Sequence, residues 1–301
     1  MAESATTEAR TDLGSGYHQR GQLELAFDRF RKHRLAMAAL FVVLGLAVLS
    51  AFAPIVSPYD PNKTNLSLIF DAPSLAHPMG TDSLGRDLAT RILFGGRVSL
   101  AVGIFAALLA LTLGTLVGIV SGYYGGVVDG ALMRLVDVLL SIPRLFLLVL
   151  LAVLFGGTVM TIIIVLGALS WMRTSRIVRA AVLSLKGREF IEAARAIGAG
   201  DTRIMTRHLL PNTIAPIVVA ATLGVACAII AESTLSFLGL GIQKPTSTWG
   251  NLLTDATTDM LQAPWVAIFP GLAIFLAVVS INFIGDGLRD ALDPRHVASR
   301  T

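Results

Sequence analysis

Six stretches of about 20 mostly apolar residues, the length that a helix needs to cross the hydrocarbon core of a bilayer, recur along this 301-residue chain. They lie at residues 35–56, 98–121, 132–155, 158–178, 213–233 and 266–286. Charged residues make up only 15% of the chain, whereas a soluble domain carries roughly 25%. The sequence therefore predicts an all-α polytopic membrane protein with six transmembrane helices.

The basic residues predict the orientation of these spans. Lysine and arginine favour cytoplasmic loops, and Arg29, Arg31, Lys32 and Arg34 precede the first span. With both termini inside, the cytoplasmic side holds 18 Lys or Arg and the opposite side five. We expect both termini in the cytoplasm. Because the basic residues border apolar runs, the net charge of +4 reflects membrane orientation and does not indicate a nucleic-acid partner.

The first span could be mistaken for a cleavable signal peptide, since Ala51-Phe52-Ala53 imitates a cleavage site. Its apolar run exceeds the roughly 7–15 residues of a signal peptide, and 34 mostly polar residues precede it. An uncleaved anchor is the better interpretation.

Two spans carry features that bear on packing. Small residues repeat every four positions in the second span and line one face (Ala106, Ala110, Gly114, Gly118, Gly122). Such a face permits close helix contact, either within the subunit, which we favour, or against a second subunit. Pro143 should kink the third span, where we expect Asp137 and Arg144 to neutralise each other.

A polar segment, residues 187–211, separates the fourth and fifth spans. Within it, residues 188–197 place apolar side chains at i, i+3, i+4 and i+7 (Phe190, Ala193, Ala194, Ile197), which predicts an amphipathic helix. Glu192 is spaced to pair with Arg188 and Arg195. A helix resting on lipid headgroups is the alternative, but two alanines on the apolar face favour close contact with a protein.

The rest of this segment predicts a second short helix. Gly198 and Gly200 suit a left-handed helix end, Asp201 is placed to cap a helix running through His208, and Pro211 fits the first turn of the fifth span. We expect an L of two helices at the cytoplasmic surface.

The spacing Glu192-Ala193-Ala194, three residues, Gly198, then Leu210-Pro211 resembles the EAA loop of permease subunits of bacterial ABC importers, which docks onto the ATPase. His208 departs from that pattern, in which isoleucine is common. We call residues 187–211 the EAA loop. The resemblance implies that its docking residues are Glu192, Ala193, Ala194, Gly198, Leu210 and Pro211.

Further motifs resemble the C-type subunit of the dipeptide/oligopeptide/nickel branch of these permeases. They are Gly80-Thr81-Asp82-Ser83-Leu84-Gly85-Arg86-Asp87, Ser141-Ile142-Pro143, the run from Arg207 to Asn212, the run from Leu235 to Gly241, and Asp293-Pro294-Arg295. The resemblance covers roughly residues 25–296. It implies a type-1 ABC importer permease fold in which the first span is an N-terminal addition.

We therefore divide the chain into four parts. Residues 1–24 form a disordered cytoplasmic N-terminus, 25–97 an anchor helix with an external segment, 98–286 the permease core, and 287–301 a cytoplasmic tail. The external stretches 57–97 and 234–265 could receive a loaded solute-binding protein. Residue by residue we favour structural roles: Trp265 as an interfacial anchor, and Gly80-Thr81-Asp82 as a cap of the second span.

The chain lacks a nucleotide-binding motif, because none of its four lysines follows a glycine as a P-loop requires. We expect no enzyme activity, no metal and no cofactor. The resemblance implies two separate ATPase subunits, a paralogous second permease, an extracytoplasmic solute-binding protein, and a bacterial or archaeal plasma membrane.

Other classes fit the sequence less well. The five histidines lie outside the spans, where none can serve an intramembrane serine. An ion-coupled carrier would place acids near the bilayer midplane, whereas Glu232 and Asp286 lie at span ends. A non-transporting membrane scaffold stays open, as does the substrate, with di- or oligopeptides, nickel or another small solute as alternatives.

Overall fold

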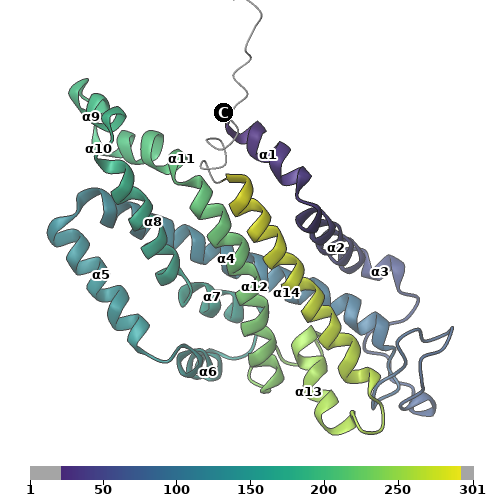
Figure 1. Cartoon of the computed structure of the whole chain (residues 1–301). Coiled ribbons are helices and arrows are strands. Elements are labelled where there is room, and N and C mark those ends of the chain that lie inside the picture. Colours follow the sequence, from purple (N-terminus) through teal and green to yellow (C-terminus); the bar gives the residue numbers. More distant parts are fainter. Residues whose placement is uncertain (1–21, 293–301) are drawn as a thin grey trace, which may run out of the picture.

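Long apolar helices packed side by side make up the computed structural model of the chain, which describes residues 22–292 (Figure 1). All regular elements assigned within that range are helices. The short elements and the three EAA-loop turns are α1 (Gln22–Lys32), α3 (Ala53–Val56), η3 (Leu66–Leu68), α9 (Glu189–Ala196), α10 (Asp201–Arg203), η4 (Ile204–Leu209), α11 (Leu210–Asn212) and α13 (Trp249–Asp259). Asp293-Pro294-Arg295, most of the expected disordered N-terminus and most of the expected tail lie outside the described residues.

Five spans of the described chain are long and apolar enough to cross a membrane, and a bent pair of helices makes a sixth. They are α2 (Arg34–Ala51), α4 (Leu88–Tyr124), α7 with α8 (Val159–Ala168 and Trp171–Lys186), α12 (Ile214–Phe237) and α14 (Trp265–Leu292), with α5 and α6 (Gly126–Ser141 and Arg144–Phe155) as the bent pair. The expected six-span, all-helical architecture is confirmed when this pair is counted as one span.

Helix α4 is much longer than the sequence-based span. Its 37 residues extend about 55 Å, well beyond a hydrocarbon core of about 30 Å. It begins ten residues earlier than expected, where the Asp87 carboxylate caps the helix by accepting the Thr90 N–H at 2.7 Å. The sequence did not predict this start because Arg91 and Arg97 interrupt the apolar pattern. The expected cap at Gly80-Thr81-Asp82 was wrong, and the boundary at residue 97 falls within α4.

The third span is broken at Pro143, with an angle of 83° between α5 and α6. This bend turns α6 away from α5, so Asp137 and Arg144 do not share a helix face and the expected pair between them was wrong. The Asp137 carboxylate instead pairs with Arg176 of α8. Arg144 Nη2 donates to Ser170 Oγ at 2.9 Å.

Small residues of α4 pack directly against α8. A Cβ atom on Gly114 would lie 2.6 Å from Thr174 Cβ, and one on Gly118 would lie 2.6 Å from the Ser175 carbonyl oxygen. Gly122 meets Val182 in the same way. The small-residue face is therefore an internal seam of this subunit, which confirms the packing that we favoured over a contact with a second subunit. We call it the α4–α8 seam.

The buried carboxylate of Glu232 joins three helices near the end of α12. Glu232 of α12 accepts hydrogen bonds from Ser99 Oγ of α4 at 3.1 Å and from Ser236 Oγ at 2.8 Å. Ser99 Oγ in turn accepts the backbone N–H of Trp249, the first residue of α13, at 3.2 Å. Because buried polar groups are costly unless paired, this set of bonds fixes the positions of α4, α12 and α13 relative to one another.

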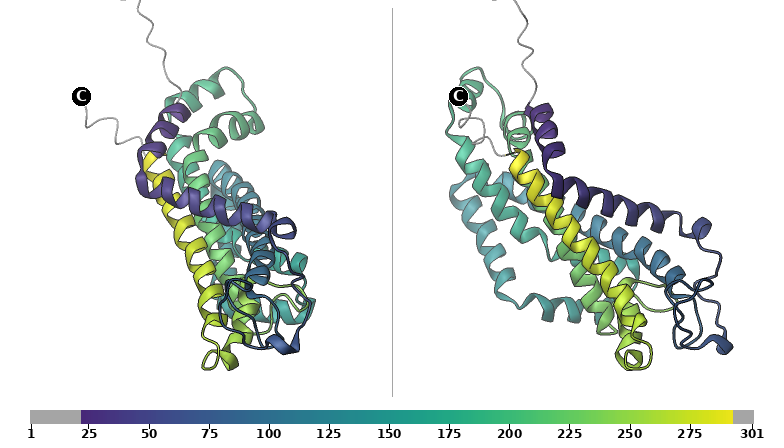
Figure 2. Two further views of the ribbon diagram at one scale, coloured as in Figure 1. Left: turned by 90° about the vertical axis from the view of Figure 1, so that its right-hand side faces the viewer. Right: turned by 45° about the vertical axis from the view of Figure 1, so that its right-hand side comes forward.

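Helix α1 packs against the last turns of α14, and α2 crosses α14, as Figure 2 shows from two sides. Phe30 of α1, Ala36 of α2 and Ala291 of α14 form one buried cluster. Gly287 allows this approach, since a Cβ there would lie 2.4 Å from Ala36 Cβ. Helix α1 was not expected, and residues 22–24, assigned to the disordered N-terminus, belong to it.

The α4–α8 seam predicts a large cost for a side chain on α4. Gly118→Leu should destabilise the protein by about 1–3 kcal/mol through overpacking, because its Cβ would lie 2.7 Å from Val178 Cβ. Gly130→Leu on α5 is the matched control, because no other atom of residues 22–292 would lie within 4 Å of its Cβ. Thermal unfolding of the detergent-purified protein should show a lower midpoint for the first variant alone. Equal midpoints would contradict the seam.

Candidate functional site

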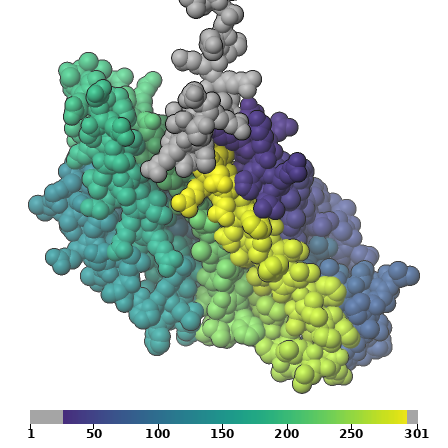
Figure 3. Space-filling view, in the orientation of Figure 1, coloured from purple at the N-terminus to yellow at the C-terminus, as the bar shows by residue number. Residues whose placement is uncertain are grey.

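The EAA loop projects from one end of the bundle as two short helical arms joined by a turn (Figures 1 and 3). The first arm is α9, which follows α8 after Gly187 and Arg188. The second arm runs through α10, the π-helical turn η4 and α11, and leads into α12. Two helices joined by a turn were expected, and the structure confirms them.

Gly198 makes the turn between the arms. Its φ of 84° is left-handed, a conformation that favours glycine. The Gly198 N–H donates to the Arg195 carbonyl at 2.9 Å and the Ala199 N–H to the Ala194 carbonyl at 3.0 Å, which completes the end of α9. Gly200 differs from the expectation: its φ is −70°, and it precedes α10 in an extended conformation. Only the first glycine has a conformational requirement.

Helix α9 buries an apolar face that the periodicity did not indicate. Ile191 and Ala194 are buried against the subunit, in or beside a cluster that includes Ile204, Val178 and Val182. Ala194 was expected on the apolar face, but its companions Phe190, Ala193 and Ile197 are exposed, Ile197 at 86%. Ile191 gives the helix a second apolar side. Helix α9 therefore buries one apolar face against the subunit and exposes the other.

Tyr123, the buried penultimate residue of α4, holds both arms. Its hydroxyl donates to Asp201 Oδ1 of the second arm at 2.6 Å. The Arg195 guanidinium of the first arm lies 5.6 Å from its ring centroid, and Lys186 Nζ lies 5.9 Å from it. Sequence reasoning missed this residue, although an aromatic pair at the end of a span is a detectable signal. Tyr123 therefore connects α4, α8 and the two arms.

Two expected side-chain interactions of the EAA loop are wrong. Within residues 22–292, the Glu192 carboxylate forms no ion pair with Arg188 or Arg195, and its side chain is exposed. Arg195 lies over Tyr123 instead. Asp201 does not cap its helix, because its carboxylate accepts the tyrosine hydroxyl.

The remaining docking candidates lie on the second arm. Leu210 is half-buried and packs against the same cluster as Ile191. Pro211 is exposed and lies in the first turn of α11, where its missing N–H costs nothing. Thr213 separates α11 from α12, so Pro211 precedes the fifth span by one short turn. The structure thus exposes Glu192, Ala193, Gly198 and Pro211 on the EAA loop, and it partly or fully buries Ala194 and Leu210.

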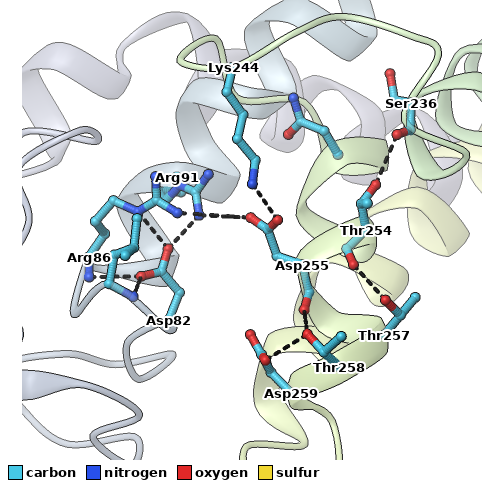
Figure 4. A network of polar contacts seen from close by, with 12 residues as sticks. Asp82, Arg86, Arg91, Ser236, Lys244, Thr254, Asp255, Thr257, Thr258 and Asp259 are labelled. Carbon is cyan, nitrogen blue, oxygen red and sulfur yellow. Dashed lines mark hydrogen bonds and ion pairs between the residues drawn. The ribbon is translucent and has the colours of Figure 1, made fainter.

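A network of charges ties together the two segments at the opposite end of the bundle (Figure 4). Asp82 accepts from Arg86 Nε at 2.8 Å and pairs with Arg91 of α4. Asp255 of α13 lies 3.7 Å from Arg91 and 2.6 Å from Lys244 Nζ. This network joins the segment before α4 to the segment between α12 and α14.

Trp265 reinforces that junction. Its Nε1 donates to the Thr81 carbonyl at 3.1 Å, and a Cβ on Gly80 would lie 2.7 Å from the same nitrogen. The expected role as an interfacial anchor was incomplete, because this half-buried ring also binds the segment before α4.

Comparison with known proteins fits this multi-pass architecture. Residues 114–297 match the model of the binding-protein-dependent transport system inner membrane component. Residues 21–78 match the N-terminal transmembrane domain of oligopeptide transport permease C. The helical bundle and both matches define a membrane permease.

The relatives extend over nearly the whole chain. The dipeptide transport permease DppC of Alkalihalophilus pseudofirmus is 41% identical over 270 residues, 90% of this chain and 89% of that protein. The oligopeptide transport permease OppC of Haemophilus influenzae is 43% identical over 269 residues, 89% and 86%. The glutathione transport permease GsiD of Escherichia coli is 46% identical over 269 residues, 89% and 88%. The chain belongs to the inner-membrane permease family of binding-protein-dependent ABC transport systems, in its C-type branch.

Tyr123→Phe tests whether this residue holds the EAA loop. Losing a hydrogen bond to a carboxylate should cost about 1.5–3 kcal/mol and speed amide hydrogen exchange in residues 189–206 at least about tenfold. Tyr124→Phe is the matched control, since the Tyr124 hydroxyl has no hydrogen bond within residues 22–292. Exchange–mass spectrometry should separate the two variants, and identical exchange in both would rule out the tie.

Proposed function

We propose that this protein is the pore-forming permease subunit of an ATP-driven importer of di- or oligopeptides and forms half of the translocation pathway. The three relatives above are named for the transport of a dipeptide, oligopeptides and glutathione, all short peptides. None is named for nickel, so a peptide is the better-supported substrate. The observation that carries the proposal is the EAA loop, a rigidly held pair of arms with an outward apolar face.

The outward face of α9 has the chemistry of a protein-docking surface. Phe190, Ala193 and Ile197 recur at i, i+3 and i+7, so they lie on one side of α9 and are exposed together. An exposed apolar set on a polar loop favours an apolar groove of a partner. We define Phe190, Ala193 and Ile197 as the docking face. The small side chain of Ala193 at its centre allows close approach.

We assign this surface to a separate ATPase subunit, because the chain has no P-loop of its own. The Glu192 carboxylate flanks the docking face without a partner in the described chain, so a basic residue of the ATPase is its expected counterpart. Gly198 fixes the backbone direction at the end of the first arm, and Pro211 does so at the end of the second. Ala194 and Leu210 act from the other side, by fixing the arms to the subunit.

The complete transporter would contain two ATPase subunits, this chain, a paralogous second permease and an extracytoplasmic solute-binding protein. ATP binding would close the ATPases and draw the two EAA loops together. Because the first arm continues α8, and α8 packs against α4 along the α4–α8 seam, such a movement would carry both helices and switch the pathway between inward and outward access.

The end that bears the EAA loop is assigned to the cytoplasm. Helix α1 and the last turn of α14 lie at this same end (Figure 1), and the bias of 18 basic residues against five favours a cytoplasmic location. Residues 57–87 and 238–264 then face outward, where they are placed to receive the solute-binding protein. In this division, the part of the chain before α4 anchors a permease core that begins with α4.

Reversing the charge on Glu192 tests the docking assignment. Glu192→Lys should abolish the substrate-stimulated ATP hydrolysis of the reconstituted transporter by removing the expected ion pair. Membrane insertion should stay normal, because this exposed side chain makes no ion pair with another described residue. ATPase assays in proteoliposomes, with insertion checked by alkaline extraction, provide the measurement. Normal stimulation would refute the role of Glu192.

Valine substitutions at Gly198 and Gly200 test whether the backbone conformation of the turn is needed for coupling to the ATPase. Gly198→Val should reduce stimulated ATP hydrolysis strongly, because a branched side chain at φ 84° costs roughly 1–2 kcal/mol and reorients the arms. Gly198→Asp should act in the same direction. Gly200→Val is the control, because its φ of −70° suits valine. If both valine variants show equal substrate-stimulated ATP hydrolysis, the geometry of the turn does not govern docking.

A further inference from the structure

The two helix breaks of the bundle meet at one cavity. A space of about 250 Å³ is lined by the end of α5, the Ser141-Ile142-Pro143 break and the start of α6 on one side. Leu169, Met172 and Arg173, from the junction of α7 and α8, line the other side. Irregular backbone inside a membrane protein is tolerated where it lines a cavity, and here two interrupted spans do so at the same place.

The lengths of α7 and α8 place this cavity near the middle of the bilayer. The ten residues of α7 separate the junction from one end of the span by about 15 Å, half of a hydrocarbon core of about 30 Å. On the other side, α8 continues for 16 residues toward the EAA loop. A solute crossing the subunit would therefore meet the cavity about halfway.

Arg144 lines the cavity without a carboxylate partner in the described chain. It donates one hydrogen bond, to Ser170 Oγ, while its Nε is buried and has no partner. The nearest acid in the sequence, Asp137 of α5, is paired with Arg176. The structure places Arg173, which the count of 18 assigned to the cytoplasmic side, in this lining as a second guanidinium, and none of the described residues that line the cavity is acidic. A cation at this depth is costly, and an unmade hydrogen bond adds to that cost, so the site favours an anion.

We propose that this cavity binds the terminal carboxylate of the solute during its passage, with Arg144 as the main contact and Arg173 beside it. The inference rests on the proposed import of peptides and names the part of the substrate that the pathway recognises. The planar guanidinium matches a carboxylate through paired N–H donors. Every linear peptide has one terminal carboxylate whatever its side chains, so this contact would serve a pathway that accepts many sequences.

A thiol-protection experiment tests the site without using ATP hydrolysis. In the complete transporter, Cys227→Ser removes the native thiol and Ser141→Cys introduces one in the cavity lining. Dialanine should slow alkylation of that thiol by N-ethylmaleimide about tenfold at ten times its Kd, since the fraction of unoccupied sites is 1/(1 + [L]/Kd). Dialanine amide, which lacks the carboxylate, should leave the rate unchanged.

Two further variants assign the effect to Arg144. Arg144→Gln should abolish protection by dialanine, whereas Arg134→Gln, at an exposed position of α5, should preserve it. Equal protection by the amide, or protection that persists in Arg144→Gln, would overturn the proposal. So would protection by phosphatidylglycerol alone, which would identify the anion as a lipid headgroup. Glu192→Lys, which tests ATPase docking, should leave dialanine protection intact, so failure of one proposal is distinguishable from failure of the other.

Discussion

The close approach of α4 and α8 is the constraint on which the rest of the structure depends. Gly114, Gly118 and Gly122 leave the last turns of one face of α4 without side chains, and the backbone and side chains of α8 occupy that space. Lipid provides no hydrophobic drive for helix association, so such packing has to come from complementary surfaces. Because α8 leads to the EAA loop at one end and borders the Arg144 cavity at the other, this one contact relates the two proposed sites.

Each end of the bundle is fixed by polar interactions of a different kind. At the EAA loop, Tyr123 contacts both arms through its ring and its hydroxyl, so the arms should move with α4. At the opposite end, Asp82 and Asp255 share Arg91. Buried ion pairs contribute little net stability, but removing one partner costs about 3–5 kcal/mol. That network therefore specifies how residues 57–87 and 238–264 fit together.

Local sequence patterns predicted much of this molecule, and the errors have a common physical origin. Apolar length located the spans, glycine chemistry located the turn at Gly198, and small residues located the seam, because each depends on near neighbours in sequence. The partner of Asp137 and the buried face of α9 depend on tertiary structure. Arg176 comes from another helix, and Ile191 made both sides of α9 apolar, so periodicity alone could not decide which side faces inward.

The central claim is that the docking face of α9 contacts a nucleotide-hydrolysing subunit while the rest of the loop is fixed to α4 and α8. Cross-linking of the assembled transporter tests it most directly, with a thiol-specific photoreactive probe at Ile197 and, in a second variant, at exposed Leu75 in the opposite segment. We predict that the probe at Ile197 captures the ATPase, identified by peptide sequencing, and that the probe at Leu75 does not. Capture of the ATPase from Leu75, or none from Ile197, would contradict the claim.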